Sequence, residues 1–226
     1  MNTATARGIR APFSRRVVAI AGATLLSLAL VSSWFATQSD AHGGASAQRA
    51  SFHDAMRGLW EEHVAWTRMF IVSFTSDVPD LNATTGRLLR NQADIGNAIR
   101  PFYGDVAADR LTRLLRTHIL TAAQLLTAAK AGDAAGVAAA SDAWYSNAND
   151  IADFLAAANP RQWSDADLRQ MMKQHLDLTL AEAVAQLGGN YDLAIAKYDA
   201  VEHEIRQMAD MLSEGVIAQF PARFVP

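Results

Sequence analysis

Three histidines recur at a nearly constant spacing in a chain of which half the residues are hydrophobic. His63, His118 and His175 are 55 and 57 residues apart, and each is followed by an aliphatic residue and, three or four positions later, by a threonine. An imidazole ring can ligate a divalent metal ion or exchange hydrogen bonds with a polar ligand. The spacing therefore indicates a site for a metal ion or a small polar ligand, provided that the three rings meet in the folded chain.

A second motif repeats with the same period. Residues 91–95 (Asn-Gln-Ala-Asp-Ile) and 147–151 (Asn-Ala-Asn-Asp-Ile) resemble each other at a spacing of 56 residues. A common period near 56 residues predicts three repeated helical hairpins, each with a histidine on its first helix. Residues equally far from the turn of an antiparallel hairpin lie at the same height. The pattern therefore places His, Asn and Asp side chains near one level of the fold.

This level is the candidate site. The predicted ligands of a divalent metal ion are His63, His118, His175, Asp94 and Asp150. The side chains predicted to hydrogen-bond a bound cofactor or ligand are Asn91, Asn147, Thr67 and Thr179. A buried polar group without a partner costs about 1–3 kcal/mol. The alternative is therefore a structural or protein-interaction module, in which the same residues form a hydrogen-bonded layer that only fixes helix register.

Several known kinds of site are missing from the sequence. No histidine has an acidic residue three positions before it, which argues against a carboxylate-bridged di-iron bundle. The chain has no cysteine, no His-Glu-x-x-His pair and no glycine-rich phosphate-binding motif. No catalytic residue is predicted, and the question of enzymatic activity stays open. On the last predicted helix Glu202 is the better candidate ligand, whereas His203 lies among the polar residues.

The charge distribution argues against a nucleic-acid partner. The whole chain has a formal net charge of -3, but four arginines and a single acid lie in residues 1–41, so the remainder is more acidic. Nucleic-acid binding needs a concentrated positive surface. A small ligand or a metal ion is the expected partner, and no protein partner is predicted.

Apolar residues from Gln48 onward recur at spacings of three and four, which is the period of one helix face, and no segment alternates at period two. The sequence therefore predicts an all-α fold. Breaks near Pro79, Pro101, Gly132, Pro160 and Gly189 divide it into about six helices. Short connections favour antiparallel neighbours, and so an up-and-down bundle of three hairpin repeats over residues 49–226.

Residues 1–41 read as a targeting segment rather than as part of the bundle. Four arginines precede an uncharged run, residues 17–36, which is long enough for a secretory signal or for an uncleaved membrane anchor. Ser39-Asp40-Ala41 would serve as a cleavage site, and Arg15-Arg16 resembles a twin-arginine signal. We expect an exported, periplasmic domain that follows a linker at residues 42–48 and contacts the membrane only if the segment is retained.

Four blocks of the sequence carry a family resemblance. They are residues 59–68 (LWEEHVAWTR), 88–95 (LLRNQADI), 101–104 (PFYG) and 208–212 (MADML). The chain resembles an uncharacterised family of small bacterial all-helical proteins, some of which carry the label glycosyltransferase. The resemblance spans about residues 59–220. It implies a helical fold and assigns no catalytic residue.

Overall fold

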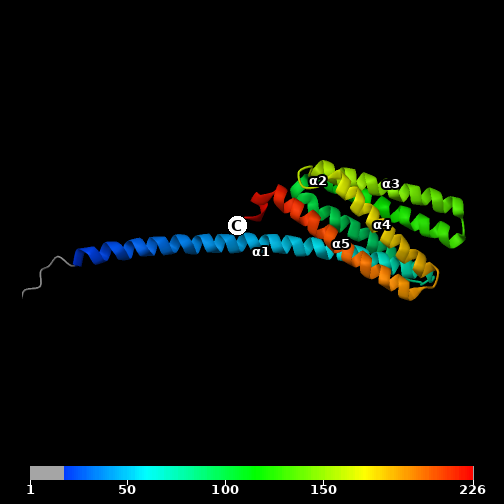
Figure 1. Ribbon diagram of the computed structural model, residues 1–226, viewed down its shortest axis with the longest axis horizontal. Helices are drawn as coiled ribbons and strands as arrows, with labels where there is room; N and C mark the ends of the chain where they lie inside the picture. Colours follow the sequence, from blue (N-terminus) through cyan, green and yellow to red (C-terminus); the bar gives the residue numbers. More distant parts are fainter. Residues whose placement is uncertain (1–17, 226) are drawn as a thin grey trace, which may run out of the picture. The chain divides into compact units, whose positions relative to one another are not determined.

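The computed structural model describes the backbone of residues 18–225 and the side chains of residues 44–225. It contains α1 (Val18–Thr75), α2 (Leu81–Ala131), α3 (Ala134–Ala158), α4 (Asp165–Leu187), α5 (Tyr191–Gln219) and the short 3-10 helix η1 (Pro221–Phe224) (Figure 1). No strand occurs within residues 18–225, which confirms the all-α prediction. The compact unit that carries the candidate site is Ser46–Val225.

The structure has five α-helices in the described range rather than about six, because the second and third predicted helices form one element, α2. Gly104 interrupts α2 with non-helical φ 79° and ψ 176°. A Cβ on Gly96 would lie 2.8 Å from the carbonyl oxygen of Ala108, although 12 residues of straight helix would separate them by about 18 Å. The two arms of α2, residues 81–103 and 105–131, therefore fold back on each other at Gly104.

The helix boundaries follow from local side chains. Asp133, Ser164 and Asn190 cap α3, α4 and α5, and each side chain accepts a hydrogen bond from the backbone amide three residues later. Gly132 ends α2 in the left-handed conformation, at φ 69°, which suits a residue without a Cβ.

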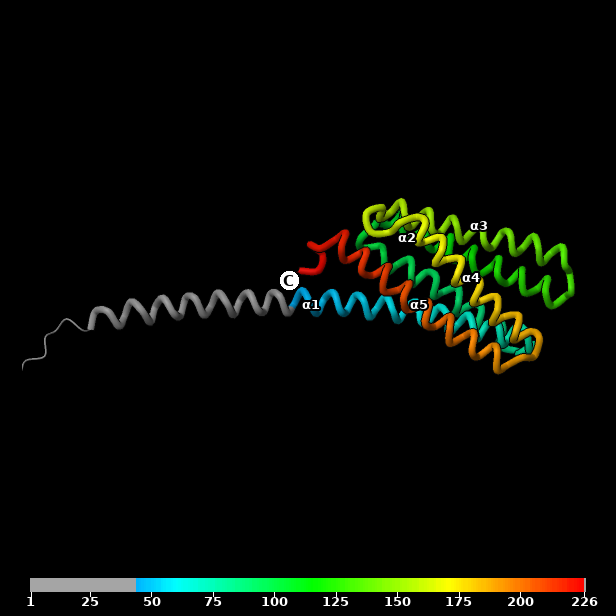
Figure 2. The backbone as a smooth tube through the Cα atoms, viewed as in Figure 1, coloured from blue at the N-terminus to red at the C-terminus, as the bar shows by residue number. Residues whose placement is uncertain are grey.

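Three pairs of antiparallel segments build the unit (Figure 2). The C-terminal part of α1 pairs with the first arm of α2, where the Asn91 side chain donates to the carbonyl of Leu59. The second arm of α2 packs on α3, α3 on α4, and α4 on α5. The buried faces form a continuous apolar core that includes Trp60, Ile95, Leu115, Ile151, Leu176 and Ile205.

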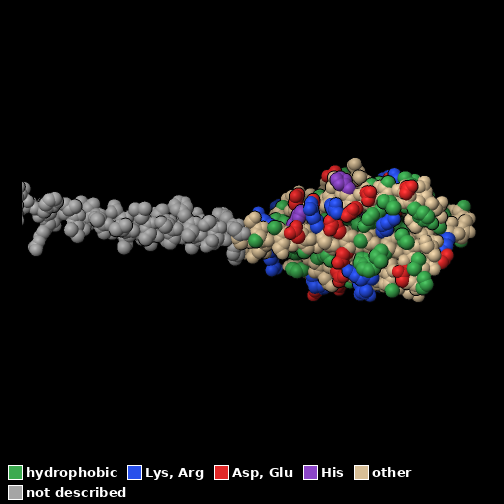
Figure 3. All heavy atoms as spheres, turned by 90° about the horizontal axis from the view of Figure 1, so that it is seen from below, with side chains coloured by type: hydrophobic (Ala, Val, Ile, Leu, Met, Phe, Trp, Pro, Cys, Tyr) green, Lys and Arg blue, Asp and Glu red, His purple; other side chains and the backbone are tan. Residues whose placement is uncertain are grey.

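The face shown in Figure 3 carries acidic and basic side chains that are interspersed. Arg57 with Asp210 and Arg206 with Glu61 are examples of the ion pairs that join different helices at the surface. Exposed pairs of this kind contribute little to stability individually, at most about 1 kcal/mol. The core therefore dominates the stability of the unit.

The targeting segment predicted at residues 1–41, including the uncharged run at residues 17–36, lies outside the residues whose side chains the structure describes. Residues 44–48, predicted as part of a linker, belong to α1. Across the described part of the chain, no helix combines the length and the apolar character that a membrane crossing requires.

Candidate functional site

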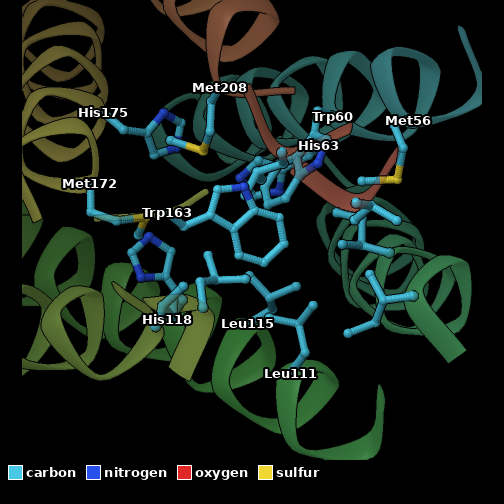
Figure 4. Close-up of a pocket in the computed structure, with 16 residues that line it drawn as sticks. Met56, Trp60, His63, Leu111, Leu115, His118, Trp163, Met172, His175 and Met208 are labelled. Atoms are coloured by element: carbon cyan, nitrogen blue, oxygen red, sulfur yellow. The ribbon is translucent and has the colours of Figure 1, made fainter. Parts of the chain in front are cut away.

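The three repeated histidines meet in the core. His63 on α1, His118 on α2 and His175 on α4 are only 4–5 % exposed, and all three line one cavity of about 30 Å³ (Figure 4). The rest of its wall comes from Met56, Trp60, Ile95, Ile99, Leu111, Leu115, Ile151, Leu155, Trp163, Met172, Met208, Leu212 and Val216. This histidine layer, as we call the three imidazoles, is thus embedded among apolar side chains and two indoles.

Each imidazole contacts a polar side chain 29 residues further along the chain. The Nδ1 atoms of His63, His118 and His175 lie 3.3, 3.0 and 2.9 Å from Gln92 Nε2, Asn147 Oδ1 and Glu204 Oε2. In every case the histidine is on the first segment of an antiparallel pair and its partner is on the second. The repeated spacing of the sequence thus corresponds to three repeated contacts.

The cavity wall repeats in the same way. The residues three positions before the histidines, Trp60, Leu115 and Met172, all line the cavity, because a spacing of three keeps them on the same helix face. One turn beyond the polar partners, Ile95, Ile151 and Met208 complete the wall. Each antiparallel pair therefore contributes an equivalent set of positions to the site, and the third pair contributes methionine at two of them.

His118 has both ring nitrogens in hydrogen bonds. The Trp144 indole donates to its Nε2 over 3.1 Å, so Nε2 carries no proton and Nδ1–H donates to Asn147 Oδ1. The amide nitrogen of Asn147 in turn donates to the carbonyl of Leu114. This chain of complete bonds leaves His118 no free nitrogen for a ligand.

His63 and His175 differ from His118 in this respect. Glu204 accepts at its carboxylate, so His175 donates from Nδ1, and no hydrogen bond holds its Nε2 among the described residues. At His63 the amide nitrogen of Gln92, which also donates to the Leu88 carbonyl and to Asn91 Oδ1, faces Nδ1, so Nδ1 accepts and the ring proton lies on Nε2. The centroids of these two imidazoles lie 5.8 Å apart.

The surroundings of His63 and His118 favour the neutral forms of these two rings. Burial lowers the pKa of His63 well below its usual value, and the neighbouring His175 and His118 lower it further. Burial, followed by the effect of His175, lowers the pKa of His118 to about 3, although the bond to Asn147 opposes the shift. Both rings are therefore unprotonated at neutral pH, which is the form that ligates metals.

Two buried carboxylates lie near the layer within residues 44–225. Glu182 is 1 % exposed and pairs with Arg68 at 2.9 Å, and burial raises the pKa of its carboxyl group against the effect of that arginine. Glu204 is 3 % exposed and bonds His175 through Oε2, while its Oε1 has no hydrogen-bond partner among the described residues. Glu204 is therefore the buried carboxylate that no arginine or lysine neutralises.

The aspartates predicted as ligands do not reach the layer. Asp94 and Asp150 are exposed, and the nearest cation to Asp94 is Arg87, at 4.0 Å. Because a helix turns about 100° per residue, Asp94 lies about 200° around the helix from Gln92, and Asp150 lies about 60° from Asn147. Glu202, preferred on the last helix, also faces outward and pairs with Arg206. Glu204, two residues later, faces the core instead.

The four predicted hydrogen-bonding residues do not all meet the rings. Asn147 bonds His118, whereas Asn91 is fully buried and donates to the backbone carbonyl of Leu59. Thr67 and Thr179 line a second apolar cavity, of about 40 Å³. Thr67 donates to the carbonyl of His63, but Oγ1 of Thr179 has no partner among residues 44–225.

Sequence reasoning missed Gln92, Glu204, Trp144 and the cavity methionines. A search for polar residues 29 positions after each histidine would have found the first two together with Asn147. Trp144 and the methionines carried no such signal, because their side-chain types also fit an ordinary helical core. Their contribution depends on which helix faces meet.

Among residues 44–225, no group of three or more His, Cys, Asp or Glu side chains is already arranged to hold a metal ion. No family model, curated protein or solved structure matches the chain. The fold and the site define the protein's class as an all-α domain with a histidine-lined internal cavity.

Proposed function

We propose that this domain binds a single metal ion at the histidine layer, with Nε2 of His63 and Nε2 of His175 as its nitrogen ligands. The observation that carries the proposal is the pair of imidazoles at 5.8 Å, each held through Nδ1 by its own partner and lining the same cavity. Two imidazoles that share one ion have centroids up to about 6.4 Å apart, since the metal–nitrogen distance is about 2.1 Å. The observed separation fits this limit.

The contacts behind the rings support the proposal. Metal-ligating histidines usually donate their second ring N–H to a carboxylate or carbonyl oxygen, which orients the ring. The bond between His175 and Glu204 has this form. At His63, ligation through Nε2 would require the ring proton to move to Nδ1 and the Gln92 amide to rotate, at the cost of its hydrogen bonds to the Leu88 carbonyl and Asn91 Oδ1.

A second candidate function is purely structural, and the completed bonds of His118 favour it. If the layer only fixes helix register, all three histidines contribute hydrogen bonds and none binds an ion. Variants of His63 or His175 would then lower the stability of the domain and leave every metal response unchanged.

Titration of the chelator-treated full-length chain with Co(II), Zn(II) and Cu(I) tests the proposal. His63→Asn and His175→Asn are the informative variants, because an asparagine amide can replace Nδ1 and its hydrogen bond but offers nothing in place of Nε2. His203→Asn, on the exposed face of α5, is the control. We expect binding to be lost in the first two and kept in the control. A folded parent chain that binds none of the ions would refute the proposal.

The proposed setting is the periplasm or another exported compartment. This part rests on the arginines and the uncharged run of residues 1–41 alone. Fractionation of cells that produce the tagged full-length chain would test it, and a cytoplasmic location would contradict it.

A further inference from the structure

The cavity beside the histidine layer contains sulfur donors as well as imidazoles. Met56, Met172 and Met208, which come from α1, α4 and α5, are 2–6 % exposed and line the same cavity as the three histidines (Figure 4). The donor atoms of the cavity wall are therefore imidazole nitrogens and thioether sulfurs. None of the side chains that line it carries an oxygen atom.

The third antiparallel pair concentrates these donors around one ring. Met172 precedes His175 by three residues, so both side chains leave the same face of α4. Met208 lies one turn beyond Glu204 on α5, and Glu204 bonds His175. Of the three histidines, His175 therefore has a methionine both on its own helix and on the partner helix. The equivalent positions of the other two pairs carry Trp60, Leu115, Ile95 and Ile151.

Deepening the proposed function, on which this step rests, we infer that the ion is soft and monovalent, namely Cu(I), held by His63, His175 and the thioethers of Met172 and Met208. Thioether and imidazole ligands suit Cu(I), whereas Mg²⁺, Ca²⁺ and Mn²⁺ prefer oxygen. The side-chain types of the cavity wall therefore favour Cu(I) over metals that prefer oxygen ligands.

The contact behind His175 also suits a metal ligand. Glu204 is a buried carboxylate without an arginine or lysine partner among residues 44–225, and it accepts the Nδ1–H of His175. A carboxylate in this position orients the ring and raises the basicity of its second nitrogen. The indoles of Trp60 and Trp163 offer further favourable contacts to a cation.

A surface groove lies next to Glu204. It lies between α4 and α5 and is lined by Asp167, Gln170, Met171, Gln174, Glu204 and Gln207. Glu204 therefore contacts the groove on one side and His175 on the other. The groove also contains the carboxylate of Asp167 and the thioether of Met171, which are favourable groups for a cation at this surface.

The inference is tested by titrating the full-length chain under anaerobic conditions with Ag(I), a redox-inert analogue, and with Cu(I) against a competing colorimetric chelator. Binding is followed by the quenching of tryptophan fluorescence, since two indoles line the cavity. The decisive variant is Met172→Leu combined with Met208→Leu, which conserves volume and so preserves packing. Met211→Leu on α5, which does not line the cavity, is the matched control.

We expect the double variant to lose about tenfold or more in Cu(I) and Ag(I) affinity, and the control to match the parent. Circular dichroism and thermal melting verify that every variant is folded. Unchanged affinity in a folded double variant would overturn the inference. Binding of Co(II) or Zn(II), but not of Cu(I), would overturn it and leave the proposed function intact. If no ion binds, both fail.

Discussion

His175 and Glu204 form a buried pair, in which Nδ1 of the imidazole lies 2.9 Å from Oε2 of the carboxylate. The pair joins α4 to α5 and places a carboxylate directly behind the ring that faces the cavity. Its counterparts in the other two antiparallel pairs are amides, Gln92 and Asn147. The third pair is therefore the only one of the three that places a carboxylate rather than an amide beside its histidine.

Replacing this carboxylate by an amide should weaken metal binding while the protein stays folded. Glu204→Gln keeps an oxygen acceptor for His175 but removes the negative charge, so we expect metal affinity to fall by about tenfold to a hundredfold. Competition with a chelator measures the change. Glu214→Gln, on an exposed position of the same helix, provides the comparison and should bind like the parent. Equal affinities in the two variants would contradict a role for Glu204 behind the ion.

The metal-free protein should lose stability in mild acid because of His118. Its folded-state pKa of about 3 lies below the usual value of 6.5, so between these values the unfolded chain binds a proton that the folded chain does not. The free energy of unfolding should therefore decrease as pH falls below about 6.5, by roughly 1 kcal/mol per pH unit for this group.

Urea titrations between pH 7 and pH 5.5 measure this slope. His63 and His175 line the same cavity as His118, and burial also lowers the pKa of His63, so the comparison must be between variants. His118→Leu should show a shallower slope than the parent, whereas the exposed His203→Leu should keep it. Identical slopes in the parent and in His118→Leu would show that His118 is not buried in its neutral form.

A substitution of Asn147, which bonds His118, should lower the stability of the protein much more than a substitution of the exposed Asp150. Asn147→Ala removes the acceptor of His118 and leaves the buried Nδ1–H of that ring unpaired; it also removes a second hydrogen bond to the Leu114 carbonyl, which lies within the helix α2. We expect a loss of about 1–3 kcal/mol in the free energy of unfolding. Asp150→Ala, three residues further on and exposed, should change it by no more than about 0.5 kcal/mol. A similar loss in both variants would contradict the assigned orientation of α3.

Gly215 should tolerate no side chain. A Cβ at this position would lie 2.0 Å from Nε1 of Trp163, whose indole lines the cavity and donates to the Met211 carbonyl. Gly215→Ala should therefore displace the indole and cost about 1–3 kcal/mol, as overpacking does. Gly58→Ala has open space and should stabilise α1 by about 0.5–1 kcal/mol. Thermal melting of the two variants should thus show shifts of opposite sign.

Removal of the Thr179 hydroxyl group should stabilise the protein. Its Oγ1 is buried without a partner among the described residues, whereas Thr67, at the equivalent position after His63, donates to a backbone carbonyl. Thr179→Val keeps the shape and removes an unsatisfied group, so we expect the free energy of unfolding to rise by about 1 kcal/mol. Thr67→Val should lower it or leave it unchanged. A destabilised Thr179→Val would indicate that this hydroxyl has a partner in solution.

The periodicity of the sequence was sufficient for the helical class and for the convergence of the histidines. Apolar residues at spacings of three and four define helix faces whatever the neighbours are, and the 55- and 57-residue steps put His63, His118 and His175 at one level. The same local logic located the end of α2 at Gly132. These features depend on contacts within a few turns of one chain segment.

Only the tertiary structure decided which polar side chains face the rings. Gln92 and Asp94, or Glu202 and Glu204, are two residues apart and therefore point in nearly opposite directions, so the rotation of each helix about its axis decides which of the two faces the rings. That rotation is set by how whole faces pack, including the fold-back of α2 at Gly104 and the indole of Trp163 seated on Gly215. The donors of the cavity come from four helices, and no local pattern records which faces of separate helices meet.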